Sequence, residues 1–457
     1  MNRDALIADR SLYTALVAEW LFPLHERLKG HRTARVLREM ECTQWWPPEQ
    51  LEAYRVERLR DFLSRVGTAV PYYRRLFKEL GFDPAAITRV AELRQLPPTE
   101  KQAIRDHADE LKAEGAAGLV EYRTSGSTGE PLTLYVSKER ISHDIAAKWR
   151  GTRWWGVDIG DPEIVVWGSP VELNIQDRLR HLRDRVLRSH LLPIIDISNE
   201  KLDRYLDQIR RVRPKMVFGY PSVLSRLAWR AKERGVEMGG LGIRVIFVTS
   251  EILQPQWKNI IVEVFKCPIA NEYGARDGGF IARECPSGGL HITAEDIIVE
   301  IVDADGRALP AGRPGEVLVT HLISADFPFL RYRTGDIATL EDRPCPCGRG
   351  LPLLRDISGR TNDCLVAADG SFIHDSALNY VIKALDDVRS YKIIQESLDR
   401  VRVLIVAGPR FRDEFIPSIH SAYKRLLGET VAIVIERVDD IPPEPSGKFR
   451  HVVNRMR

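Results

Sequence analysis

The sequence predicts an α/β fold, multi-layer and with mainly parallel sheets covered by helices, followed by a small C-terminal α+β domain. Three observations support this class. Strand-like and helix-like segments alternate between residues 163 and 265, which is typical of a parallel sheet with helices on its faces. From about residue 290 the pattern becomes β-rich with Asp-Gly and Pro-Gly turns. The length of 457 residues exceeds one average domain.

The first 115 residues are predicted to be mostly helical, because "RVERLRDFLSRVGTAVPYYRRLFKELGF" (55–82) places apolar residues at helical spacing. The early apolar run "SLYTALVAEWLFPLHERL" (11–28) contains Glu19, Pro23 and Glu26. It is too short and too polar to span a bilayer. We therefore expect an amphipathic helix packed on the core and no stable membrane insertion. Contact with a membrane surface is the alternative.

The central alternation gives three strands and three helices. "SNEKLDRYLDQIRRVR" opens with a Ser cap and "SVLSRLAWRAKERG" closes with Gly. A further helix is expected at "SKERISHDIAAKWRGTRWWG" (137–156). The expected strands are 163–169, 215–222 and 243–251, and the expected helices are 198–213, 222–235 and 253–265.

Two domains are expected. A large N-terminal domain covers 1–358, including a β-rich module at about 290–358, and a small mobile C-terminal domain covers 359–457. The segment "LRDISGRTND" is the expected linker.

Composition excludes several classes of protein. The 67 basic and 64 acidic side chains nearly balance, so no nucleic-acid partner is inferred. Six Cys in a chain of this size do not suggest a disulfide scaffold. The N-terminus lacks the layout of a secretion signal. A cytoplasmic protein of enzyme size is expected.

One loop is unusually small and polar. It comprises Thr124, Ser125, Gly126, Ser127, Thr128 and Gly129. Small residues let backbone N–H groups approach an anion, and hydroxyls add donors, so such loops cradle phosphates. The Gly-Lys-Ser/Thr ending of a Walker A loop is absent. Taken alone, the loop is also compatible with a plain flexible turn.

Six further motifs follow the loop in a fixed order: "FGYPS" (218–222), "VTSE" (248–251), "NEYGARDGG" (271–279), "RYRTGD" (331–336), "ISGRTND" (357–363) and "PPEPSGKFR" (442–450). This ordered set resembles the adenylate-forming superfamily of acyl-CoA synthetases. The helical N-terminus and compact C-terminal domain look most like its phenylacetate–CoA ligase branch, which includes relatives associated with capsular polysaccharide synthesis. The resemblance covers nearly the whole chain and implies the adenylate-forming enzyme fold.

The resemblance implies a role for each motif. The loop at 124–129 would clamp the β- and γ-phosphates of ATP. Asp277 stands where the family usually has Glu, and would help hold Mg²⁺; a surface turn residue is the alternative. Asp336 would accept the ribose hydroxyls, and Arg360 would touch ribose or phosphate. The remaining nucleotide-binding candidates, at the adenine pocket and the Tyr-Gly turn, are Ser250, Glu251, Asn271, Glu272, Tyr273 and Gly274.

Lys448 is the candidate catalytic residue. When a carboxylate meets the α-phosphorus, negative charge accumulates, and a Lys ammonium bridging the two groups relieves it. The preceding Gly447, on a mobile domain, would let the Lys arrive only for that step. The alternative is an ordinary Lys among basic neighbours.

Four residues could form a second constellation. Cys285, His291, Cys345 and Cys347 offer three thiolates and one imidazole, the donor set of a closed structural Zn²⁺ site. The two pairs are far apart in sequence, so the fold must join them. Free buried thiols beside a lone His are the alternative.

The expected reaction joins a carboxylic acid to ATP as an acyl-adenylate with release of pyrophosphate, and then transfers the acyl group. By the resemblance, the acceptor is the CoA thiol. Trp167 and Tyr220 would line an aryl-acid pocket, or else belong to the core. Alternatives are an amide or ester ligase with an amine or hydroxyl acceptor in polysaccharide or natural-product synthesis, a nucleotidyltransferase that ends at the adenylate, and an inactive scaffold. A homodimer is compatible with the resemblance.

Overall fold

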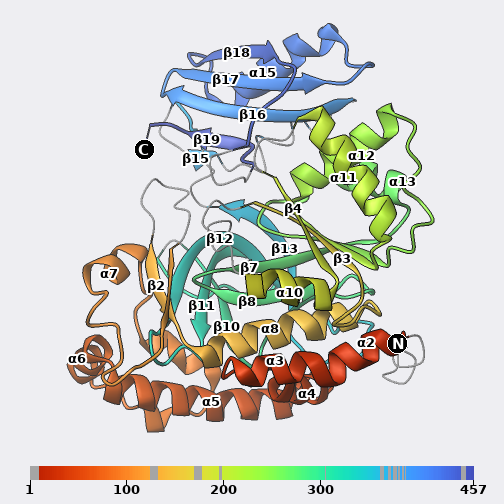
Figure 1. Ribbon diagram of the computed structural model, residues 1–457. Helices are drawn as coiled ribbons and strands as arrows, with labels where there is room; N and C mark the ends of the chain where they lie inside the picture. The colour runs from red at the N-terminus through yellow and green to blue at the C-terminus, as the bar shows by residue number, and fades with distance from the viewer. Residues whose placement is uncertain are drawn as a thin grey trace.

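The computed structural model comprises a large body and a smaller C-terminal unit (Figure 1). It describes residues 10–123, 132–168, 178–194, 198–303, 305–360, 365–368, 372–373, 378, 381–382, 385, 387–443 and 449–456. The C-terminal unit lies at one end of the molecule and helices α3 to α6 lie at the opposite end. The expected fold class, α/β with a small C-terminal α+β domain, is confirmed.

Helices dominate the N-terminal part. They are α2 (Leu12–Leu16), η1 (Val17–Leu21), α3 (Phe22–Leu28), α4 (Thr33–Thr43), α5 (Pro48–Ala69), α6 (Pro71–Leu80) and α7 (Lys101–Asp106). The early apolar run packs on the core through Val17 and Phe22, while Leu12 and Trp20 face outward. Within the described residues, no helix has both the length and the apolar character needed to cross a membrane.

A hairpin frames the small polar loop. Strands β1 (Val120–Arg123) and β2 (Thr133–Val136) pair antiparallel, and the last pair of the register joins Arg123 to Thr133. The loop residues at 124–131 lie outside the described residues. Helix α8 (Lys138–Arg153) follows, and the side chain of Ser137 accepts a hydrogen bond from Arg140 N at its start.

The predicted alternation forms the parallel half of an 11-stranded sheet. In order across the sheet these strands are β4 (Ser189–Pro193), β3 (Glu163–Trp167), β5 (Met216–Gly219), β6 (Val245–Val248) and β7 (Ile269–Ala275). Helices α11 (Asn199–Val212), α12 (Pro221–Glu233) and α13 (Pro255–Phe265) connect them. Ser198 caps α11 as expected, accepting from Lys201 N.

Two elements of this half carry no clear sequence signal. Helix α10 (Arg178–Leu187) and the edge strand β4 fall between two predicted elements. The helix contains four Arg residues among ten, and the strand is short and ends at Pro193. In the helix the apolar residues Leu179, Leu182, Val186 and Leu187 have helical spacing but stand among charged residues over only ten positions, and the five-residue strand is too short to show a period.

The sheet continues antiparallel beyond β7. Its order is β7, β8 (Gly279–Glu284), β9 (Leu290–Ile292), β13 (Leu353–Arg360), β12 (Tyr332–Glu341), β11 (Pro314–His321) and β10 (Ile297–Val302). The expected β-rich module from about 290 corresponds to β9 through β13. Because β8 already pairs antiparallel with β7, the change from parallel to antiparallel pairing occurs inside one continuous sheet.

The C-terminal unit has its own sheet and core. The order β18 (Ala432–Arg437), β17 (Arg400–Ala407), β16 (Val388–Ser397), β19 (Val452–Asn454) is covered by α15 (Ile416–Leu427). A two-stranded ribbon, β14 (Leu365–Val366) and β15 (Phe372–Ile373), precedes it. Tyr391, Val401, Val403 and Tyr423 are fully buried in its core.

A buried charge cluster joins α8 to the antiparallel half. His143 Nδ1 lies 2.9 Å from both oxygens of Asp296, and Arg58 of α5 lies 3.5 Å from the same carboxylate. Burial alone would raise the pKa of Asp296, but the positive charges of His143 and Arg58 lower that pKa to about 2. Burial opposes the charged form of His143, yet Asp296 raises the pKa of the imidazole.

We expect Asp296→Asn to lower the free energy of unfolding by about 3 kcal/mol, because it leaves His143 and Arg58 buried without their counter-ion. The depressed pKa of Asp296 gives stability that is lost as pH falls from 3.8 towards about 2. The raised pKa of His143 gives stability that is lost as pH rises above 6.5. Denaturant unfolding should therefore show the largest difference in unfolding free energy between Asp296→Asn and wild type from pH 3.8 to pH 6.5.

The exposed Asp305→Asn serves as the matched control, since its carboxylate is 66% exposed beside Arg307. That variant should unfold like wild type at every pH. A pH-independent difference for Asp296→Asn would contradict the assigned ion pair.

Candidate nucleotide and acyl site

The parallel strands bring the predicted motifs to one edge of the sheet. Gly168 follows β3, Tyr220 follows β5, Thr249 follows β6, and Asn271 lies in β7. All four strands are parallel neighbours. In open α/β sheets, ligands bind in the crevice outside the carboxyl ends of such strands.

Glu251 connects three of the motifs. Its carboxylate accepts hydrogen bonds from Ser222 N at 3.1 Å and Ser222 Oγ at 3.0 Å. It also accepts one from Phe449 N. The preceding Ser250 has a φ of +69°, a conformation that residues other than glycine rarely adopt and that often occurs at functional sites. The residue after Lys448 is thus fixed against the carboxyl ends of β5 and β6.

Aromatic rings hold the small domain on the large one at this point. The ring of Trp257, in α13, lies 5.8 Å from that of Phe449 and 4.9 Å from that of His451. His451 also lies 4.4 Å from the ring of Tyr391. Arg389 forms an ion pair with Glu233 at 3.0 Å. In Figure 1 the small domain accordingly lies beside α11 and α12.

Tyr273 and Asp336 meet although 63 residues separate them. The Tyr273 hydroxyl donates to Asp336 Oδ2 at 2.9 Å, and both residues are buried. Asp336 in β12 stands opposite Arg360 in β13; the side chain of Arg360 lies outside the described residues. The structure therefore brings together three sequence-predicted residues, two of them through their side chains.

The side chains of Asn271 and Glu272, in the motif "NEYG", bind residues of the neighbouring strand β8. Asn271 donates from its backbone N and its Nδ2 to Glu284 Oε2, at 2.8 and 2.9 Å. Burial raises the pKa of the Glu284 carboxyl. Glu272 accepts from the fully buried Arg283 at 2.5 Å. The side chains of Asn271 and Glu272 thus already have protein partners, and Gly274 in β7 has no side chain.

Helix α8 holds the turn between β7 and β8, which carries Asp277. Arg140 donates to the carbonyl oxygens of Arg276 and Asp277, each at 2.9 Å. One turn along α8, Asp144 accepts from Phe280 N at 3.0 Å. The helix therefore holds both ends of the turn.

Asp277 itself is buried, with 8% of its surface exposed. Its Oδ2 accepts from the Tyr332 hydroxyl at 2.6 Å, and its Oδ1 accepts from Gly278 N at 3.0 Å. Each carboxylate oxygen has two lone pairs, so these bonds leave acceptor capacity for a cation or its water. The fixed carboxylate meets the chemical requirement for a hard ion such as Mg²⁺.

Trp167 and Tyr220 are neighbours, with ring centroids 4.4 Å apart. Tyr220 is 1% exposed and belongs to the core of the parallel half. Trp167 is half-buried and also stacks on Phe218 at 5.7 Å. Of the two, Trp167 is therefore the aromatic with surface available to a ligand.

Two sets of predicted residues cannot be placed. Thr124 to Gly129 and Lys448 lie outside the described residues. Their flanking residues are placed: the β1–β2 pairing brackets the loop, and Phe449 follows Lys448.

The cysteine and histidine candidates come together. Cys285, His291, Cys345 and Cys347 present ligand atoms that all lie within 4.8 Å of one another. This cluster lies on β9 and on the connections beside it.

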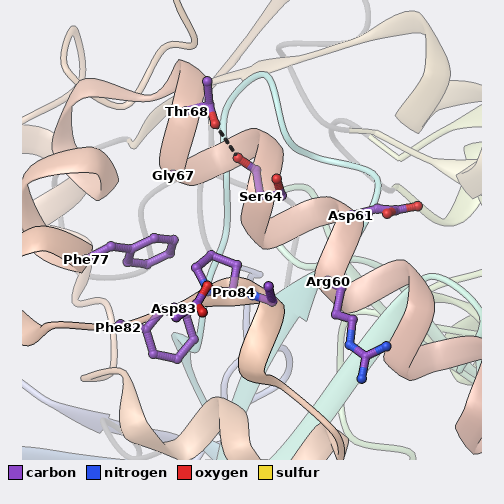
Figure 2. Close-up of a pocket in the computed structure, with 10 residues that line it drawn as sticks. Arg60, Asp61, Ser64, Gly67, Thr68, Phe77, Phe82, Asp83 and Pro84 are labelled. Atoms are coloured by element: carbon purple, nitrogen blue, oxygen red, sulfur yellow. Dashed lines mark hydrogen bonds between the residues drawn. The ribbon is translucent and has the colours of Figure 1, made fainter.

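A separate hollow of about 630 Å³ lies on the helical N-terminal part, between α5, α6 and the short helix η2 (Pro84–Ala86) (Figure 2). Its lining includes Arg60, Asp61, Phe77 and Phe82. No lining residue belongs to the predicted motifs, so this hollow is not part of the candidate site.

Sequence reasoning missed the residues that position the site. Arg140, Asp144 and Glu284 bind backbone groups of other segments, whereas Phe449 donates its own backbone N–H to the side chain of Glu251. No sequence signal identified them, because the burial of Arg140 is evident only in the structure.

The C-terminal unit matches a described family. Residues 365–455 match the family model "CapK C-terminal domain". Protein CapK of Staphylococcus aureus is 24% identical over 95% of this chain and 94% of that protein. The phenylacetate-coenzyme A ligase of Thermus thermophilus is 26% identical over 89% of this chain and 97% of that protein. These matches confirm the resemblance inferred from the motifs.

Solved structures share the fold. A 2-hydroxyisobutyryl-CoA ligase in the postadenylation state, in complex with R3-HIB-AMP, has a TM-score of 0.74 and 19% identity, covering 90% of this chain and 91% of that one. The same ligase with 2-HIB-AMP and CoA in the thioesterification state has a TM-score of 0.61 over equal shares. The chain thus superposes better on the former state.

We expect Arg140→Met to loosen the turn at 275–280. The carbonyls of residues 276 and 277 lose their buried donor, at a cost of about 1–3 kcal/mol. Hydrogen–deuterium exchange of peptides covering this turn should accelerate more than exchange in α12. Arg35→Met, on the exposed face of α4 with 72% of the side chain accessible, should leave it unchanged. Equal protection of the turn in both variants would refute the role of Arg140.

Proposed function

We propose that this chain, a relative of the CapK and phenylacetate-coenzyme A ligase proteins over about nine-tenths of its length, activates a carboxylic acid as an acyl-adenylate at the expense of ATP. The acyl group then passes to an acceptor, which we propose is the thiol of CoA. The observation that carries the proposal is the convergence of the motifs at one sheet edge, where Glu251 binds Ser222 and Phe449.

In the first half-reaction a carboxylate oxygen of the acid attacks the α-phosphorus of ATP. The bond from that phosphorus to the bridging oxygen breaks, and pyrophosphate leaves with the electron pair. We assign the ribose hydroxyls to Asp336, whose carboxylate is held by Tyr273. We assign the outer phosphates to the loop from Thr124 to Gly129, whose small residues allow close approach of backbone N–H groups.

We assign to Lys448 the positive charge that stabilises the transition state of adenylation. Its ammonium would bridge the attacking carboxylate and the α-phosphate, where charge develops in the transition state. The hydrogen bond from Phe449 N to Glu251 supports this assignment, because it brings the neighbouring residue to the carboxyl ends of the parallel strands. The better superposition on a postadenylation state is compatible with it.

Asp277 is the proposed protein contact for Mg²⁺. When bound, the ion would neutralise phosphate charge. Since both carboxylate oxygens already accept hydrogen bonds from Tyr332 and Gly278, a contact through water fits better than direct ligation. The role of Arg140 and Asp144 is to keep this carboxylate in place.

In the second half-reaction the acceptor attacks the acyl carbon and AMP leaves. For CoA, the thiol loses its proton to solvent as the thioester forms. ATP and CoA as co-substrates imply a cytoplasmic reaction. Trp167 is the proposed contact for an aryl or arylacetic acid, since an aromatic face can stack on a planar substrate.

A second candidate is an amide or ester ligase in which an amine or hydroxyl replaces CoA. The specific observation in its favour is the C-terminal domain, which matches the CapK model. In a two-domain enzyme of this kind the small domain contributes to the second half-reaction. An enzyme with a different small domain can therefore transfer the acyl group to a different acceptor.

Hydroxamate trapping distinguishes these functions. The full chain is incubated with Mg·ATP, hydroxylamine and a panel of aryl, alkyl and amino acids, with and without CoA. We expect pyrophosphate and hydroxamate with one class of acid, and a CoA thioester when CoA replaces hydroxylamine. Acyl-AMP without CoA consumption would favour the second candidate. No pyrophosphate with any acid would point to an inactive scaffold.

We expect Lys448→Ala to lower the rate of adenylation by about 100-fold or more, because a charge aimed at the transition state is removed. ATP binding, measured by calorimetry, should remain nearly intact. Lys424→Ala in α15 of the same domain is the control, and its adenylation rate should equal that of wild type. Loss of folding or of nucleotide binding in Lys448→Ala would overturn the assigned role.

A further inference from the structure

Four side chains from two distant segments converge beside the sheet, outside the candidate nucleotide site. Cys285 begins the turn between β8 and β9, and His291 lies in β9. Cys345 and Cys347 lie in the connection between β12 and β13. The Sγ atoms of Cys285 and Cys345 are 3.6 Å apart, and Cys347 Sγ lies 3.2 Å from His291 Nε2.

These distances match the edges of a tetrahedron around a metal. With Zn–S bonds of about 2.3 Å, two sulfur ligands on a tetrahedral ion lie about 3.8 Å apart. A disulfide would require about 2.05 Å, far less than the 3.6 Å between Cys285 and Cys345. We propose that Cys285, His291, Cys345 and Cys347 bind one Zn²⁺ as a structural ion.

Two matching turns present the sulfur ligands. Gly288 N donates to Cys285 O at 2.8 Å, and Gly348 N donates to Cys345 O at 3.1 Å. Both glycines have φ near +80°, at +83° and +80°, which other residues rarely adopt. A Cβ on Gly289 would lie 2.5 Å from Cys345 Sγ. The backbone is therefore shaped to let the two segments approach at the sulfur atoms.

The imidazole is oriented for ligation. His291 Nδ1 lies 3.3 Å from the carbonyl oxygen of Leu351, to which it can donate. That bond selects the tautomer with its lone pair on Nε2, the nitrogen that faces Cys347. Trp154 packs against the ring at 5.4 Å between centroids. A carbonyl behind the ligating His is the usual second contact of a zinc site.

Burial and donor type decide which role and which ion fit. Cys285 is 0%, His291 1% and Cys345 6% exposed. Four protein ligands complete a tetrahedron and leave no position for a substrate, which is the pattern of a structural and not a catalytic ion. Three thiolates and one imidazole favour Zn²⁺ over the hard ions Mg²⁺ and Ca²⁺. Binding would release the thiol protons to solvent.

The ion would tie three distant parts of the chain together. Next to the cluster, Arg349 Nε donates to Gln44 Oε1 at 3.2 Å, and Gly350 N donates to Gln44 O at 3.0 Å. Trp154 Nε1 donates to the same side-chain oxygen at 2.8 Å. Gln44 follows α4, so the cluster connects the N-terminal helices to the β8–β9 turn and to the β12–β13 connection. This role is independent of the proposed reaction.

Metal analysis of the tag-free full chain tests the proposal. Elemental mass spectrometry should find about one zinc per chain. Cys347→Ser should lose most of that zinc and melt at a lower temperature, while Cys42→Ser, which changes an exposed thiol, should retain it. At low temperature the Cys347→Ser protein should keep its nucleotide affinity, because the ion does not contact the nucleotide site.

A second measurement uses only wild-type protein, so it tests the proposal even where the Cys347→Ser variant fails to fold. Wild-type protein is stripped with a chelator and refilled with Co²⁺, whose intense visible absorption and thiolate charge-transfer band report a tetrahedral sulfur-rich site. Refilling with Zn²⁺ should restore the original melting temperature. A wild-type chain that is isolated without zinc and takes up no Co²⁺ would overturn the proposal, as would a Cys285–Cys345 disulfide in non-reducing mass spectrometry.

Discussion

The parallel order of β3, β5, β6 and β7 is the constraint on which the rest of the molecule depends. Parallel neighbouring strands end at the same edge of the sheet. The segments that directly follow these strands therefore lie close together in space, although dozens of residues separate them in the sequence. Backbone N–H and C=O groups beyond a strand end also lack ladder partners. The carboxylate of Glu251 accepts a hydrogen bond from one such group beyond β5, the backbone N–H of Ser222 in the first turn of α12.

A turn at such an edge needs support from outside the sheet. The β7–β8 turn obtains it from α8, since Arg140 and Asp144 are 3.6 Å apart and hold carbonyl and amide groups on either side of Asp277. Burying these charges is costly unless each is paired. The buried His143–Asp296 pair, which lies between Arg140 and Asp144 along α8, also attaches this helix to the antiparallel half of the sheet.

The sequence predicted the helices and strands better than the side-chain contacts between them. The strands and helices between 198 and 265 follow from apolar periodicity with Ser and Gly boundaries, and the ordered motifs predicted the fold. Helix α10 and strand β4 were missed because each is short and because charged residues outnumber the apolar ones in α10. The contacts of Arg140 and Glu284 could not be predicted, since each depends on which backbone groups of another segment lack partners. The contact of Phe449 depends on how the C-terminal unit meets Glu251. The four zinc-ligand candidates were recognisable by type, but only the pairing of β9 with β13 brings them together.

The contacts between the two domains are suited to being broken. Arg389 and Glu233 keep 30% and 42% of their side chains exposed, and Arg226 and Asp440 keep 31% and 58%; such pairs contribute about 0–1 kcal/mol each. The aromatic contacts of Trp257 with Phe449 and His451 add about 0.5–1.5 kcal/mol per pair beyond their buried area. In the proposed two-step reaction, an interface of this strength would let the small domain keep one arrangement for adenylation and adopt another for acyl transfer. A larger apolar interface would fix the small domain in place, and a two-step reaction that needs two arrangements of one small domain would then stop after the first.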